Sequence, residues 1–198
     1  MVTSLKLADV VAMALGLPPE TVVQHLRNLV KAELISFKGY GRGAAQMTPG
    51  DASRLLIAVA GADFVKDSLT TLRAFGQLLP IGYARREGPY ITLEDHLAGL
   101  LATLASDAYA ANDSEDRERI GHVGLSLMSV ASVDPDRFPR IAISRSGRTG
   151  SGAISFATPT WQTPVISIAE YAMRMKGAGL IRERHVTREV METIARSL

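Results

Sequence analysis

Residues 14–35 of the chain read ALGLPPETVVQHLRNLVKAELI. Residues 7–15, which overlap their start, carry apolar side chains at helical spacing. Residues 16–18, Gly-Leu-Pro, interrupt that helix because glycine and proline both disfavour continued helical backbone. A second helix is predicted over residues 19–32, since Pro19 suits a first helical position. The sequence therefore predicts two helices joined by a tight turn.

The second of these helices is predicted to be amphipathic. Its apolar residues recur three and four positions apart, which is typical of a helix with one buried face: Val22, Leu26, Leu29 and Val30. Glu20 and Thr21 lie in its first turn. The polar residues of the remaining positions are expected to face outward: Gln24, His25, Arg27, Asn28 and Lys31.

A two-stranded wing is predicted to follow. Residues 34–37 can pair with residues 44–47 around a tip that reads KGYGRG over residues 38–43. Three glycines allow the tip to turn and to approach another backbone closely. The tip also carries two cations and one aromatic ring: Lys38, Arg42 and Tyr40. The tyrosine either packs on a sugar or covers the turn.

Residues 14–35 resemble the winged helix-turn-helix modules of bacterial regulators of the MarR and ArsR type. The matching features are the small-Leu-Gly-Leu turn, the Thr-Val start of the second helix, the His-Leu-Arg stretch and the final Leu-Ile. The chain departs from that pattern at Glu33, where such modules usually have a glycine. With its wing, the resemblance covers the N-terminal 50 of the 198 residues.

In modules of this kind the second helix enters the major groove of DNA, and the wing lies along a phosphate backbone or the adjacent minor groove. The resemblance implies that Thr21 and Gln24 face base edges or phosphates and that Lys31 lies on the backbone. The same fold can also serve protein contact alone, in which case these side chains form a solvated face. The DNA-binding residues that the resemblance implies are Pro19, Glu20, Thr21, Gln24, His25, Arg27, Asn28, Lys31, Lys38, Tyr40 and Arg42.

The composition is that of a globular protein, with 46% apolar and 21% charged residues. No apolar run approaches the ~18–20 residues that a membrane-spanning helix needs. The N-terminus lacks the layout of a signal peptide. The chain has no cysteine, which excludes disulfides, thiolate metal sites and thiol catalysis. We therefore expect a cytoplasmic protein with no membrane partner.

The net charge of +2 is unevenly distributed along the chain. Residues 101–136 carry two basic and seven acidic side chains, whereas residues 137–198 carry ten basic and four acidic ones. The basic last third either binds acidic surface of the same or a neighbouring subunit, or is kept for a polyanion. Three of its arginines form a candidate second phosphate-contact surface: Arg140, Arg145 and Arg148.

The pattern as a whole predicts an α+β fold in three parts. Residues 1–50 form the winged helix-turn-helix, residues 51–111 a helical linker or oligomerisation region, and residues 120–198 a C-terminal domain with short antiparallel strands and helices. Apolar alternation predicts the strands near residues 123–127, 141–143 and 154–156. Threonines that can cap helices predict helix starts: Thr48, Thr92, Thr163 and Thr187.

The predicted function is sequence-specific binding of double-stranded DNA by a transcriptional regulator. A homo-oligomer, preferably a dimer, is expected because paired half-sites match dimer symmetry. A small-molecule effector is compatible with this role. An alternative is the DNA-recognition subunit of a phage genome-packaging machine of the small terminase kind, which would assemble as a ring.

Signals for catalysis are weak. The glycine-rich residues 147–152 lack the Gly-Lys-Ser/Thr ending of a phosphate-binding loop. The consecutive residues Glu94, Asp95 and His96 cannot converge on one ion from a helix. We therefore expect no metal, no cofactor and no enzymatic activity.

Overall fold

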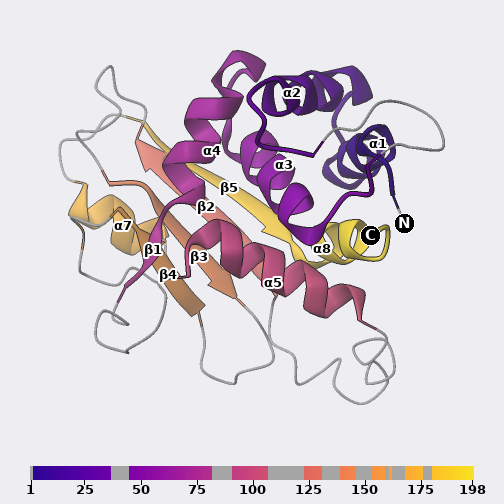
Figure 1. Ribbon diagram of the computed structural model, residues 1–198. Helices are drawn as coiled ribbons and strands as arrows, with labels where there is room; N and C mark the ends of the chain where they lie inside the picture. The colour runs from indigo at the N-terminus through magenta and orange to yellow at the C-terminus, as the bar shows by residue number, and fades with distance from the viewer. Residues whose placement is uncertain are drawn as a thin grey trace.

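The computed structural model places a layer of helices against an antiparallel sheet (Figure 1). It describes residues 2–36, 45–81, 91–106, 123–130, 139–145, 153–158, 161, 168–175 and 180–198. Within these ranges, no helix combines the length and the apolarity needed to cross a membrane. The predicted α+β class is confirmed at this level.

The first two helices follow the sequence prediction closely. Helix α1 (Ser4–Leu15) ends at Gly16, whose φ of 65° lies in the left-handed region that favours glycine. Helix α2 (Pro19–Lys31) begins after the extended Pro18, with Pro19 at its first position. The predicted pair of helices with a tight turn is therefore confirmed.

The next segment is helical but more broken than expected. The bounds are α3 (Pro49–Gly61), the 3-10 turn η2 (Val65–Asp67), α4 (Ser68–Gly76), the short strand β1 (Leu79–Pro80) and α5 (Leu93–Ala105). Both α3 and α5 begin with a capping box, Thr48 with Asp51 and Thr92 with Asp95. Both predicted threonine caps are thus confirmed, and the described part of the predicted helical region 51–111 is divided into several helices and the short strand β1.

The sheet has five strands in the order β1-β4-β3-β2-β5, all antiparallel. The longer strands are β2 (Gly124–Val130), β3 (Ile141–Arg145), β4 (Ala153–Ala157) and β5 (Ile181–Thr187). In the register of the β3–β4 pair, Ile143 lies opposite Ser155. The three predicted strands are confirmed, and they form the centre of the sheet.

Strand β5 was not predicted. Its sequence is IRERHVT, in which four consecutive charged or imidazole-bearing residues hide any apolar alternation. The strand pairs with β2 over its whole length, from Gly124 opposite Thr187 to Val130 opposite Ile181. It occupies one edge of the sheet, and charged residues are common on edge strands because they oppose pairing with other chains.

Two further helices complete the fold. Helix α7 (Ile168–Arg174) follows the helix start predicted at Thr163, and Thr163 itself lies outside the described residues. Helix α8 (Arg188–Ala195) begins where the sequence predicts, because the Thr187 side chain accepts a hydrogen bond from the backbone N–H of Val190.

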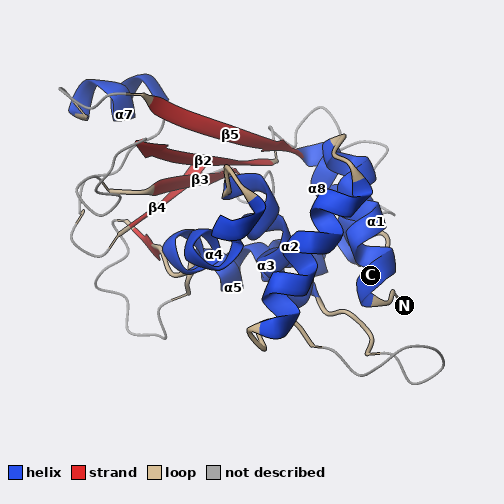
Figure 2. Ribbon diagram, turned by 90° about the horizontal axis from the view of Figure 1, so that it is seen from above, coloured by secondary structure: helices blue, strands red, loops and turns tan. Residues whose placement is uncertain are grey.

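The two faces of the sheet pack against different partners. On one face, Leu125, Leu127 and Phe156 belong to a large apolar core shared with α1, α2, α3, α5 and α8 (Figures 1 and 2). On the other, Met128 and Ile143 pack with α7 residues in a second, smaller core. The larger core runs from Val2 to Ala195, so the three predicted parts share one interior rather than three separate ones.

The leucines of α5 show this sharing most clearly. Leu93, Leu97, Leu101 and Leu104 are all buried. Helix α5 contacts α3, α4 and α8 of its own chain. The apolar face of α5, which lies in the predicted linker or oligomerisation region 51–111, is therefore buried within the monomer.

Candidate nucleic-acid interface

Helix α2 presents a narrow exposed stripe opposite its buried face. Val22, Leu26 and Leu29 are buried as predicted, and Val30 is half-buried. The exposed stripe consists of residues spaced four, three and four positions apart, which places them on one side of the helix: Glu20, Gln24, Arg27 and Lys31. Pro19 is also exposed at the start of the helix, and Thr21 is half-buried.

His25 does not face outward, and that prediction is wrong. Its side chain is buried, with 4% exposed, and its Nδ1 lies 2.8 Å from the Oγ of Ser68 at the start of α4. Burial lowers the pKa of His25 below its usual value of 6.5, because the charged imidazolium is poorly solvated there. His25 therefore joins α2 to α4 as a neutral side chain and is not available to DNA.

Asn28 lies on the same flank of α2 and has a similar structural role. Its Nδ2 donates to the backbone carbonyl of Val65 at 2.9 Å and to Ser68 Oγ at 3.3 Å. The hydroxyl of Ser68 donates in turn to Val65. Asn28 is half-buried, so the expectation that it faces outward is also wrong. Together His25 and Asn28 fix the η2–α4 junction against α2.

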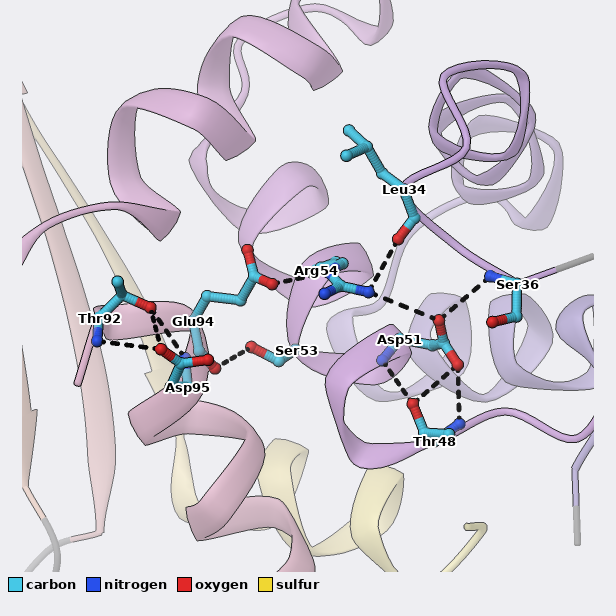
Figure 3. A network of polar contacts seen from close by, with 9 residues as sticks. All are labelled: Leu34, Ser36, Thr48, Asp51, Ser53, Arg54, Thr92, Glu94 and Asp95. Carbon is cyan, nitrogen blue, oxygen red and sulfur yellow. Dashed lines mark hydrogen bonds and ion pairs between the residues drawn. The ribbon is translucent and has the colours of Figure 1, made fainter. Parts of the chain in front are cut away.

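The chain that enters and leaves the predicted wing is held at both ends by Asp51 (Figure 3). Its carboxylate accepts hydrogen bonds from the backbone N–H of Ser36 at 3.2 Å and from that of Thr48 at 2.9 Å. Arg54 adds a bond from Nη1 to the carbonyl of Leu34 at 3.0 Å. Its Nε donates to Glu94 at 2.6 Å, which ties this base to α5.

The wing itself is only partly described. Lys38, Tyr40 and Arg42 lie outside the described residues, as do the rest of residues 37–44. Among the described neighbours, residues 34–36 and 45–47 carry no strand. The backbone N–H of Met47 instead donates to the carbonyl of Val2 at 2.9 Å. The two predicted strands are therefore absent from residues 34–36 and 45–47. For residues 37 and 44 they stay a prediction.

Five arginines in the described part of the last third pair with acids of the same chain. Arg182 and Arg184 on β5 both pair with Asp63, which lies between α3 and η2. Arg184 also donates to the carbonyls of Ala60 and Ala62 at the end of α3. The remaining pairs in this region are Arg174 with Glu170, and Arg188 and Arg196 with Glu192.

The predicted second phosphate-contact surface has no shared geometry in the described part of the chain. Arg140 is half-buried and is engaged in an interaction of its own. The backbone of Arg145 ends β3, opposite Gly124 and Ala153. Arg148 lies outside the described residues. The structure therefore does not bring these three side chains together as a described site.

The cations of α2 differ from those of the last third. Among the described side chains, Arg27 and Lys31 are exposed and form no ion pair, and the same holds for Lys6, Lys66 and Arg73. Among the described side chains, the cations without an ion pair thus lie on the helices and on η2. A charge that has no internal partner remains available to an external anion.

Glu94, Asp95 and His96 point to three different partners. Glu94 binds Arg54, and Asp95 caps its own helix through Thr92. His96 bonds through Nε2 to Ser144 Oγ on β3 at 2.9 Å, and its ring lies 5.1 Å from that of Phe156. Burial lowers the pKa of His96. The group serves to dock α5 on the helix α3 and on the sheet.

Sequence reasoning missed the side chains that position α2 and the wing base. The bond from Ser36 to Asp51 depends on a chain reversal that no local pattern shows. Ser68 and Arg54 carried no recognisable signal. The single available clue was the helical position of His25 and Asn28, three residues apart on one flank, where two polar residues can share an inward partner.

Comparison of the chain with protein-family models, with curated proteins and with solved structures finds no match.

Proposed function

We propose that the protein binds double-stranded DNA in a sequence-specific manner, with α2 as the recognition helix. The observation that carries the proposal is the exposed stripe of α2, whose two cations Arg27 and Lys31 have no acidic partner among the described residues. The helix follows a tight turn after α1, as a recognition helix does in helix-turn-helix proteins.

The chemistry of the stripe suits the major groove. A helix with side chains is about 10–12 Å wide, and the major groove about 12 Å. Gln24 can pair with the N6 and N7 of adenine, Arg27 with the O6 and N7 of guanine, and Glu20 can accept from the N4 of cytosine. Lys31, at the end of the helix, is suited to a phosphate.

The ion pairs within the last third argue against strong, sequence-independent binding of polyanions by this part of the chain. Most of the described arginines there already bind carboxylates of the same chain. A protein that coated DNA without sequence preference would leave such charges free to bind phosphates. We infer that binding depends on α2 and the wing, with Lys38 and Arg42 as further phosphate contacts and Tyr40 beside them.

A single helix and wing give little affinity, so we propose that a homo-oligomer binds repeated half-sites, most simply as a dimer. Transcriptional regulation in the cytoplasm is the role that best fits such a molecule. Measuring the mass of the protein by light scattering, alone and with bound DNA, tests this part. A dimer supports the regulator, whereas a large ring supports a packaging component.

The experiment that tests the DNA-binding proposal is equilibrium titration of a random-sequence duplex pool, followed by sequencing of the bound fraction. The wild-type protein should enrich a short motif. Gln24→Ala should abolish the base preference at one position of the motif. Arg196→Gln, which removes a charge near the C-terminus, is the matched control and should leave the motif unchanged.

A further inference from the structure

The segment that His25 and Asn28 hold against α2 carries a cation that the sequence did not single out. Lys66 lies in η2, directly after Val65, whose carbonyl accepts the hydrogen bond from Asn28. Its side chain is exposed and pairs with no acid among the described residues. Val65 and Ser68, which lie on either side of Lys66 in the chain, both form hydrogen bonds with α2. These contacts fix the backbone of Lys66 relative to α2.

The Lys66 ammonium is also supported by an aromatic ring. Its Nζ lies 5.2 Å from the centre of the Phe64 ring, within the range of a cation–π contact. Phe64 is itself 64% exposed, so the contact lies at the surface. The ring contacts the ammonium without neutralising its charge.

The nearest upstream acid does not compete for this cation. The carboxylate of Asp63 pairs with two guanidinium groups, those of Arg182 and Arg184 of β5, so its negative charge is already neutralised. Asp67, the next residue after Lys66, is half-buried and is the remaining acid of the turn. The segment therefore combines one free cation with one acid whose removal would strengthen the local positive potential.

We propose that η2 is a second phosphate-contact element, in which Lys66 binds the DNA backbone beside the groove that α2 occupies. This inference rests on the proposed function of α2. A helix is about as wide as the major groove. Segments that pack on the sides of a helix in the groove therefore lie next to the phosphate strands that border the groove. Because α2 and α4 lie side by side (Figures 1 and 2), η2 occupies such a flank.

The test is the salt dependence of duplex binding by the full-length protein. Lys66→Gln should make the negative slope of log K against log[salt] shallower by about 0.9, the value for one phosphate contact on B-DNA. It should not change the enriched motif, since phosphate contacts carry no direct sequence information. Asp67→Asn should act in the opposite direction and tighten binding at low salt.

Two controls separate this inference from the proposal on which it rests. Arg27→Gln on α2 should weaken binding whether or not η2 touches DNA, and Arg196→Gln near α8 should have no effect on the slope. If Arg27→Gln weakens binding while Lys66→Gln leaves the salt slope unchanged, the proposed phosphate contact of Lys66 is wrong. The proposal that α2 is the recognition helix is then still supported. If the wild-type protein ignores duplex DNA at low salt, both are wrong.

Discussion

The Nδ1 of His25 lies 2.8 Å from the Oγ of Ser68, so a buried histidine in the middle of α2 is joined to the first residue of α4. The contact turns one flank of the helix inward and leaves the opposite stripe free. It also sets the position of η2 relative to α2, because Asn28 binds Val65 and Ser68 at the same junction. The proposed interface thus depends on residues that do not themselves face the DNA.

The burial of His25 and His96 predicts that stability falls in mild acid. Both folded-state pKa values lie below 6.5, so the folded protein binds fewer protons than the unfolded chain as the pH decreases. The stability that the neutral imidazoles contribute is present above pH 6.5 and is lost as the pH falls through the folded-state pKa values. Urea unfolding at pH 7.5 and pH 5.5 measures the effect.

The variant His25→Gln tests the contribution of one of the two imidazoles. Glutamine can still bond to Ser68 but does not titrate. The loss of unfolding free energy between pH 7.5 and pH 5.5 should therefore be smaller in the variant than in the wild type. An equal loss in both proteins would show that His25 is not held neutral by burial.

Asp51 is expected to matter more for stability than Asp95, although both occupy the third position of a capping box. Asp51 is 1% exposed and also accepts from Ser36, whereas the Asp95 contacts are exposed. Asp51→Ala removes a buried carboxylate that accepts two part-buried hydrogen bonds, from the backbone N–H groups of Ser36 and Thr48, and should cost about 2–3 kcal/mol. Asp95→Ala removes an exposed cap and should cost about 1 kcal/mol. Similar costs for both variants, measured by urea unfolding, would contradict the role of Asp51 at the base of the wing.

The ion pairs of Asp63 should contribute little and should weaken with salt. Side chains of Asp63, Arg182 and Arg184 are all partly exposed, so solvent screens their attraction. Asp63→Asn is expected to lower the free energy of unfolding by about 1 kcal/mol at low ionic strength, and by less in 1 M salt. A cost that did not change with salt would indicate that packing, rather than charge, holds β5 to the α3–η2 connection.

The double variant Lys38→Ala with Arg42→Ala tests the proposed wing contacts. Binding should weaken across all duplex sequences, and its salt dependence should become flatter, because phosphate contacts are lost. The enriched motif should stay the same. A changed motif with an unchanged salt slope would instead place these residues on base edges.

The helices could be predicted well because the residues that begin and end them act on their near neighbours in the sequence. Gly16, Pro19, Thr48 and Thr92 end or begin helices through contacts within a few residues. The alternation of apolar residues in β2, β3 and β4 is also readable, because large apolar residues recur at every second position of each strand and the residues between them are small, such as Ser126, Ala142 and Ser155. Strand β5 carries no such local signal. Its arginines form hydrogen bonds with residues 119–124 positions away in the chain, and a local pattern cannot show these partners.

The candidate site was predicted only in part, and the errors have one cause. The helical period placed His25 and Asn28 among the polar residues of α2, but it could not show that η2 would supply polar partners on that flank. The period did identify Gln24, Arg27 and Lys31 as exposed. The shared core could not be predicted from local patterns, because α8 returns from the C-terminus to pack on α1 and α5.

The central claim, that α2 reads DNA sequence, is tested most directly by sequencing the duplexes bound from a random pool by the wild-type protein and by Gln24→Ala in parallel. We predict that the wild type enriches a motif, and that the variant loses the preference at one position while its salt slope stays the same. Absence of duplex binding at low salt, or an enriched motif that is identical for both proteins, would contradict the claim.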